Sequence, residues 1–264
     1  MERMPVVFIG HGSPMNAIED NVFTQGWKAL AKTLPTPKGI LMVSAHWYTN
    51  SLCTTNVSEP KMIYDMYGFP EALYRVKYPV KGSPELAKRL QALLGSQLSI
   101  DNTWGLDHGA WSVLVHLFPK ADIPVVQLSV HAALPPKALY EIGRTLRILR
   151  EEGILIIGSG NIVHNLRRVD WEHATTGYPW ADAFDHAIKE AILNFDHETC
   201  LDYAHLDGAP LAVPTPDHYD PLLYVLGATY PEEPIQIYND TRTMGSLSMT
   251  SYVWGLPSKE KEKK

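Results

Sequence analysis

The sequence has little cysteine and no excess of basic residues. Its 264 residues include two cysteines, Cys53 and Cys200, which stand alone rather than at the spacing of metal ligands. Lys and Arg number 23 against 29 Asp and Glu, a formal net charge of −6, and no basic stripe could neutralise a row of phosphates. We therefore expect neither a cysteine metal site nor a nucleic-acid partner.

Long apolar runs and targeting signals are also lacking. No stretch approaches the roughly 20 apolar residues that a bilayer-spanning helix needs, so we expect no membrane insertion. The first residues lack the basic-then-apolar pattern of a signal peptide, and together with the isolated cysteines this predicts a cytoplasmic location. The seven Trp and 13 Tyr leave room for a homo-oligomer interface without defining one.

The composition is that of a folded globular protein. Hydrophobic residues make up 45% and charged residues 20%, without repeats or low-complexity linkers. The length suits one large hydrophobic core. We expect a single catalytic domain over residues 1–257, followed by a solvated tail of mixed charge over residues 258–264.

Apolar runs alternate with segments of helical periodicity. The runs 5–9, 39–45, 124–130 and 153–157 are nearly continuous, which is typical of parallel strands buried on both faces. Ser83 and Pro84 predict the start of a helix, and further helices are expected over 21–34, 110–117, 136–150, 179–194 and 217–226. The predicted fold is α/β: one domain with a central, mostly parallel mixed sheet flanked by helices. Residues 59–79 predict a long surface segment that could form the wall or lid of a site.

Histidines follow two of the predicted buried strands. His11 comes directly after the run 6–10, and His46 comes directly after the run 40–45. Ligands bind at the carboxyl ends of the strands in open α/β sheets. If the two strands are parallel, His11 and His46 meet at the same edge of the sheet.

Two further histidines follow segments rich in glycine or proline. The run 154–157 leads through a Gly-Ser-Gly-Asn turn to His164, which we expect at the same edge. His218 lies between Pro216 and Pro221, directly before the helix expected from the apolar residues 222–225. Prolines restrict the backbone, so this position could hold an imidazole firmly.

The convergence of these side chains favours a metal site. A divalent transition metal needs several neutral imidazole or carboxylate donors around one point, and strand ends hold such donors firmly. A single histidine is more often a structural or surface residue. For two histidines that each end a buried strand, a functional role and a structural role are about equally frequent. Both interpretations therefore stay open at this point.

His108 and His131 are weaker candidates. Asp107 is suited to cap the helix that follows it, so His108 could be an acid/base or substrate-binding residue, or only a turn residue. His131 follows the run 125–130 and could reach the same edge in a supporting role.

Five ordered segments resemble those of a known family, the class III extradiol ring-cleavage dioxygenases. The likeness is strongest to the 4,5-DOPA extradiol dioxygenase branch and spans nearly the whole chain. The segments are His11-Gly12-Ser13-Pro14, Ser44-Ala45-His46-Trp47, residues 106–111, residues 158–165 and residues 214–224.

The resemblance implies a metal-dependent enzyme that opens a catechol ring with O2. By this likeness, His11, His46 and His218 would bind the metal, His164 would be a further ligand or the acid/base residue, and His108 would contact substrate or oxygen. Fe(II) is the expected metal for activity, and Zn(II) could occupy the site in the purified protein. Protocatechuate-cleaving relatives use a carboxylate as the third ligand, whereas here the matching segment offers His218 between Asp217 and Asp220.

The sequence leaves open the roles of several other residues and allows one other class of reaction. Ser13 and Asn161 could orient polar groups of a small aromatic diol or could satisfy turn backbones. Tyr219, and Tyr64 and Tyr67 in the surface segment, could line an aromatic pocket or pack in the core. Three histidines with an open position would also suit a zinc-dependent hydrolase.

Overall fold

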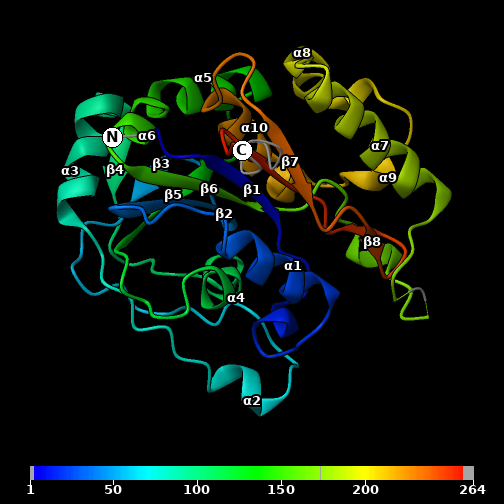
Figure 1. The fold of residues 1–264 in the computed structure, drawn as a ribbon, viewed down its shortest axis with the longest axis horizontal. Coiled ribbons are helices and arrows are strands. Elements are labelled where there is room, and N and C mark those ends of the chain that lie inside the picture. The colour runs from blue at the N-terminus through cyan, green and yellow to red at the C-terminus, as the bar shows by residue number, and fades with distance from the viewer. Residues whose placement is uncertain (1–2, 173, 258–264) are drawn as a thin grey trace, which may run out of the picture.

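The structure is a computed structural model that describes residues 3–172 and 174–257. The predicted tail over 258–264 lies outside the described residues. One eight-stranded sheet has the order β4-β3-β5-β2-β6-β1-β10-β7 (Figure 1). Its strands are β1 (Val6–Gly10), β2 (Gly39–Thr49), β3 (Leu52–Thr54), β4 (Leu98–Ile100), β5 (Val125–His131), β6 (Ile154–Gly160), β7 (Ile235–Tyr238) and β10 (Ser251–Trp254).

The centre of the sheet is parallel. Strand β6 pairs in parallel with β1 and β2, and β2 pairs in parallel with β5. Antiparallel pairs occur towards the edges, where β10 joins β1 and β7 and where β3 joins β5. The prediction of a mostly parallel mixed sheet is confirmed.

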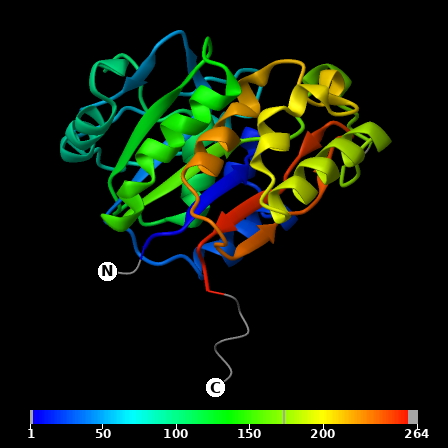
Figure 2. The same ribbon diagram turned by 90° about the horizontal axis from the view of Figure 1, so that it is seen from above.

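Helices cover both faces of the sheet (Figures 1 and 2). They are α1 (Val22–Ala31), α2 (Glu71–Tyr74), α3 (Pro84–Leu94), α4 (His108–Leu117), α5 (Pro136–Leu146), α6 (Ile148–Glu151), α7 (Pro179–Leu193), α8 (His197–Leu201), α9 (Ala209–Ala212) and α10 (Asp220–Gly227). Short 3-10 turns include η1 (Pro14–Ala17), η3 (Leu166–Arg168) and η5 (Pro216–His218). Among the described residues, no helix is long and apolar enough to cross a bilayer.

Alternate residues of each central strand enter two separate cores. In β1, Val6 and Phe8 pack with α5, α7 and α10, whereas Val7 and Ile9 pack with α1 and α4. Because both faces are covered, the central strands contain apolar residues at consecutive positions, as the sequence indicated.

The carboxyl ends of β1, β2 and β6 lie next to one another and form one edge of the sheet. The backbone N–H of His11 continues this pairing by donating to the Gly160 carbonyl at 3.0 Å. Strand β2 extends to Thr49, beyond the predicted end at Ala45, and its register with β5 shifts between Val43 and Tyr48. His46 lies within this irregular stretch, where the regular pairing with β5 is interrupted.

Some elements differ from the sequence prediction in length or were not predicted. The helix expected over 136–150 is divided at Arg147 into α5 and α6. The antiparallel strands β7 and β10 were not predicted because they are four residues long and lie among turn residues.

Candidate metal centre

Three histidines from separate elements converge at this edge of the sheet. His11 follows β1, His46 lies in β2, and His218 ends η5. Each offers one nitrogen, and these nitrogens all lie within 4.8 Å of one another. The backbone of β6 permits this approach because Gly160 has no side chain: a Cβ there would lie 2.1 Å from the His218 carbonyl oxygen.

The spacing of the nitrogens fits a shared metal ion. The Nε2 atoms of His11 and His46 face each other at 3.2 Å. Two nitrogens bound to one ion at about 2.1 Å lie about 3.0 to 3.4 Å apart, depending on the coordination geometry. Two imidazole lone pairs at this distance repel each other unless a cation or a proton lies between them, so the donor set fits a metal.

Hydrogen bonding fixes the tautomer of His11. Ser159 Oγ donates to the Gly109 carbonyl at 2.6 Å and therefore accepts from Nδ1–H of His11 at 2.9 Å. The proton on Nδ1 leaves the lone pair of Nε2 free for a metal.

Asp65 lies between two of the histidines. Its Oδ2 is 3.0 Å from Nδ1 of His46, and its Oδ1 accepts the backbone N–H of His108 at 2.9 Å. Nδ1 of His108 is also 3.0 Å from Oδ1, without the alignment of a hydrogen bond. Burial raises the pKa of Asp65, but the two imidazoles outweigh this and hold the pKa well below its usual range. The carboxylate thus directs Nε2 of His46 towards His11.

His218 and His164 form a stacked pair. Their ring centroids are 3.4 Å apart and the ring planes differ by 5°. Nδ1 of His218 lies 2.5 Å from Asp217 Oδ2, which leaves Nε2 of His218 as the free nitrogen. A nitrogen of His164 lies within 4.8 Å of ligand atoms of Asp217 and His218, in a second possible metal-binding group that shares His218 with the group of His11, His46 and His218.

Burial keeps most of these imidazoles neutral. Desolvation, followed by the neighbouring imidazoles, lowers the pKa of His11 and His218 well below the usual value. Desolvation is also the main cause that lowers the pKa of His164 to about 4. Burial lowers the pKa of His46 as well, but Asp65 and Asp107 outweigh it and raise the net value. Neutral imidazole is the form that binds a metal or accepts a proton.

Helix α4 positions His108. Asp107 caps the helix by accepting the Ala110 N–H at 3.2 Å, as predicted, and it also accepts from Ser44 Oγ at 2.7 Å. Ser44 belongs to β2, so this bond ties the start of α4 to the strand that carries His46. The ring centroids of His46 and His108 are consequently 3.9 Å apart.

The histidines form the floor of a cavity of about 540 Å³. All five predicted residues, His11, His46, His108, His164 and His218, line it. The lining also includes eight apolar side chains from three segments, which we call the outer wall. They are Met66, Tyr67, Phe69, Leu166, Val169, Trp171, Met244 and Leu247.

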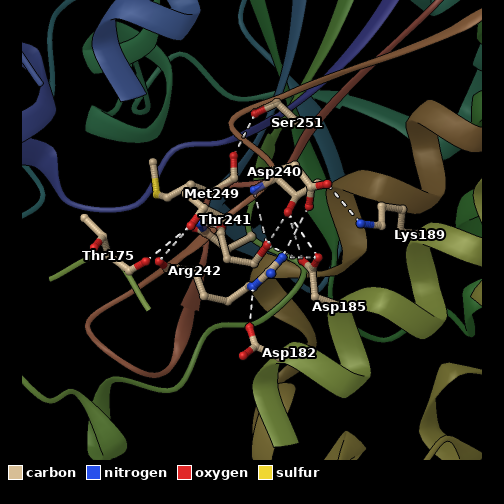
Figure 3. Close-up of polar contacts among 12 residues, drawn as sticks. Thr175, Asp182, Asp185, Lys189, Asp240, Thr241, Arg242, Met249 and Ser251 are labelled. Carbon is tan, nitrogen blue, oxygen red and sulfur yellow. Dashed lines mark hydrogen bonds and ion pairs between the residues drawn. The ribbon is translucent and has the colours of Figure 1, made fainter. Parts of the chain in front are cut away.

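One part of the outer wall is held by an ion-pair network around Arg242, which includes the buried Asp185 (Figure 3). The short hairpin of β8 (Arg242–Thr243) and β9 (Leu247–Ser248) carries the wall residues Met244 and Leu247. Arg242 pairs with Asp182 at 2.7 Å and with the buried Asp185 at 2.8 Å, both on α7. The hairpin is therefore anchored to a long helix.

The three predicted substrate-binding residues lie in different places. Ser13 lines the cavity, and its hydroxyl also accepts the Met15 N–H at 3.2 Å. Asn161 and Tyr219 are buried and are not among the cavity-lining residues. Asn161 donates to the Ser248 carbonyl, and Tyr219 donates to the Cys200 carbonyl.

Asp65 and most of the outer wall were not predicted from the sequence. Asp65, Met66 and Tyr67 all belong to the segment 59–79, which was predicted to form a wall or lid. Tyr67 lines the cavity, whereas Tyr64 packs on Trp111 and donates to the Val76 carbonyl. A lone carboxylate in an irregular segment gives no sequence signal of its own.

Comparison with known proteins agrees with this geometry. Residues 5–253 match the family described as the catalytic LigB subunit of aromatic ring-opening dioxygenase. The chain is 47% identical over 254 residues to the 4,5-DOPA dioxygenase extradiol of Escherichia coli K12, with 94% of each chain covered. It is 39% identical to the protein of the same name from Beta vulgaris, covering 93% of this chain and 94% of that one. A crystal structure of an uncharacterized protein from Escherichia coli K12 superimposes with a TM-score of 0.84 at 44% identity, covering 95% of this chain and 99% of that one.

The protein belongs to the LigB family of aromatic ring-opening dioxygenases and is an extradiol enzyme of the branch that contains these relatives. The family decides between the two reaction classes that the histidines alone allowed. Ring-opening oxidation is supported, and the alternative of a zinc hydrolase is not.

Proposed function

We propose that the protein opens the ring of a DOPA-like catechol with O2, using iron(II) held by His11, His46 and His218. The observation that carries the proposal is the convergence of three imidazoles whose Nδ1 atoms already have partners, beside two further histidines on the same cavity. The names of the Escherichia coli and Beta vulgaris relatives support DOPA as a substrate of this kind.

Iron(II), when bound, supplies the redox chemistry that O2 requires and leaves coordination positions for the substrate, as in other oxygenases with three protein ligands. Zinc could replace it in the purified protein, because imidazole sites generally bind zinc more tightly than iron(II).

His164 is proposed as the general base. Its low pKa keeps it neutral near pH 7, so its free nitrogen can accept a proton from a catechol hydroxyl. His164 stacks on His218 and does not belong to the group of His11, His46 and His218, which supports a role beside the metal. His108, across the cavity floor and next to Asp65, is proposed to deliver a proton to oxygen. Ser13 is proposed to orient a polar group of the substrate.

The reaction would break the bond between a hydroxyl-bearing carbon and its unsubstituted neighbour. Both atoms of O2 would enter the product, a semialdehyde acid that absorbs visible light and is yellow. The test is anaerobic loading with iron(II), followed by air and a panel of catechols, with oxygen uptake and absorbance recorded. Absence of turnover across the panel by the iron-loaded protein would contradict the proposal.

Two broader predictions accompany this function. A cytoplasmic location would suit the two unpaired, buried cysteines, Cys53 and Cys200, since disulfides are rare in reducing compartments. Assembly into a homo-oligomer also stays a prediction, which sedimentation of the purified protein would test.

A further inference from the structure

Asp185 is a buried carboxylate that the proposed chemistry does not use. It lies on α7, is fully buried and does not line the cavity. Arg242 donates to its Oδ2 at 2.8 Å (Figure 3). Thr250 Oγ1 lies 3.1 Å from both carboxylate oxygens, and Ser248 Oγ donates to Oδ1. Since apolar residues can often replace a buried ion pair at no cost in stability, stability alone does not account for this carboxylate.

The hairpin bonded to Asp185 also pairs with the segment that carries His164. Leu247 and His164 form an antiparallel bridge. Two backbone hydrogen bonds flank this bridge, one of 2.9 Å from Ser248 to the Val163 carbonyl and one of 3.1 Å from Asn165 to the Ser246 carbonyl. A shift of residues 246–248 would therefore shift the backbone of His164 with them.

Ser248 is the residue at which the two sets of contacts meet. Its backbone N–H holds the segment of His164, and its hydroxyl donates to Asp185 on a helix of 15 residues. One further bond holds His164 independently of the hairpin, since its own N–H donates to the Ala212 carbonyl at 2.8 Å. Loss of the contact with Asp185 should thus displace the imidazole of His164 without releasing it.

The exact place of His164 matters for the reaction. Its ring stacks on His218 with centroids 3.4 Å apart, and both rings line the cavity. Proton transfer requires that a base lie within hydrogen-bond reach of the proton it accepts. A displacement of about 1 Å, caused by a substitution far from the reacting atoms, can reduce a rate by about a hundredfold.

We infer that Asp185 is a positioning residue for ring opening: through Ser248 it fixes residues 246–248 and thereby the place of His164 at the cavity. The inference rests on the proposed function, because Asp185 acts only through the proposed base. Asp185 itself touches neither the substrate nor the metal.

The test measures the effect of Asp185→Asn with and without His164. The variant keeps an oxygen that can accept from Ser248 but removes the charge that pairs with Arg242. With iron-loaded protein and DOPA under air, it should lower kcat by about tenfold or more at unchanged iron content. In His164→Ala, the same change should lower kcat by less than about twofold, because residues that act as a unit are not additive.

Glu233→Gln is the matched control for lost stability. Glu233 is 7% exposed, pairs with Arg150 at 2.6 Å and does not line the cavity. Asp185→Asn and Glu233→Gln both remove a buried carboxylate from an arginine, and urea denaturation gives the stability that each one loses. Glu233→Gln should leave kcat unchanged. If it lowers kcat as much as Asp185→Asn does, loss of stability explains both results and the inference is overturned.

Ser248→Ala tests the same connection even if Asp185→Asn does not fold. It removes the hydroxyl that donates to Asp185 and keeps the backbone bond from Ser248 to Val163. It should lower kcat by about threefold or more, as expected for one member of a hydrogen-bonded network, and should have no such effect in His164→Ala.

The outcomes separate failure of this inference from failure of the proposed function. An unchanged kcat in folded Asp185→Asn or in Ser248→Ala overturns the inference. Equal losses of kcat with and without His164 also overturn it, because Asp185 would then act by another route. Absence of turnover in the wild-type protein contradicts the proposed function, and full activity of His164→Ala contradicts the proposed base. Both of these last results are seen while Asp185 is intact.

Discussion

The floor and the outer wall of the cavity are built in opposite ways. On the floor, His11, His108 and His218 are 7% exposed or less, and their positions are set by strand ends, a helix start and a proline-bounded turn. On the wall, Tyr67 and Trp171 are more than three-quarters exposed and come from irregular segments. Regular elements thus hold the proposed metal ligands and catalytic groups, whereas these exposed wall residues come from irregular segments.

The largest expected effect is that of replacing His11 on the cavity floor. His11→Ala should lose bound metal and reduce ring cleavage by on the order of a thousandfold, because the ion contributes several kcal/mol to the reaction. Metal content after dialysis and oxygen uptake measure the two effects. The control is His131→Ala: His131 also ends a parallel strand, β5, but does not line the cavity. Full activity of His11→Ala would refute the assignment of the centre.

The next prediction distinguishes whether His164 is a general base or a metal ligand. His164→Ala should retain most of the bound metal and reduce kcat by about a hundredfold or more, within the usual range for a general base. Metal titration followed by steady-state kinetics tests this. If the variant loses metal to the same extent as His11→Ala, His164 is a ligand rather than the base.

Asp65 connects the floor with the wall, and we expect an intermediate effect there. Asp65→Asn should weaken metal binding by about 10- to 100-fold, the usual effect of removing a carboxylate that orients a ligand histidine. Competition with a chelator measures the affinity. Glu59→Gln is the control, because Glu59 lies in the same segment but pairs with Lys81 on the surface. Equal affinities for the two variants would show that Asp65 does not orient His46.

The smallest effects concern stability and compare one glycine from each region. Gly160→Ala should lower the free energy of unfolding by about 1–3 kcal/mol or more, because the new Cβ meets the rigid backbone of His218. Gly68, beside the wall residue Phe69, has φ of +78° and open space around it, so Gly68→Ala should cost about 1 kcal/mol from backbone strain alone. Urea denaturation of both variants gives the comparison. A Gly68→Ala effect as large as that of Gly160→Ala would mean that the wall segment is packed as tightly as the floor.

The floor could be predicted from the sequence because its histidines follow recognisable elements. Buried parallel strands give continuous apolar runs, and the residue after such a run falls at a known edge of the sheet. His11 and His46 were located in this way, whereas His131 was expected at the same edge in a supporting role but does not line the cavity. Strand β5 lies on the far side of β2 from β6 and β1, and strand order is a long-range property that a single sequence does not display.

The wall and the supporting residues could not be predicted in the same way. Asp65 reaches His46 and His108 through the folding of an irregular segment, so no periodicity marks it. Asn161 and Tyr219 stand next to residues of the site in sequence, yet the chain turns their side chains to the carbonyls of Ser248 and Cys200. Proximity in sequence indicates that a residue lies near the site, whereas the direction of its side chain depends on the complete fold.

The position of Asp65 makes metal affinity and substrate affinity interdependent. Asp65 lies 3.0 Å from Nδ1 of His46, and the next two residues, Met66 and Tyr67, line the same cavity. A catechol that immobilises Met66 and Tyr67 should also immobilise the carboxylate against the imidazole, so it should raise the affinity of the site for the ion. By reciprocity, the loaded ion should tighten the binding of the catechol by the same factor.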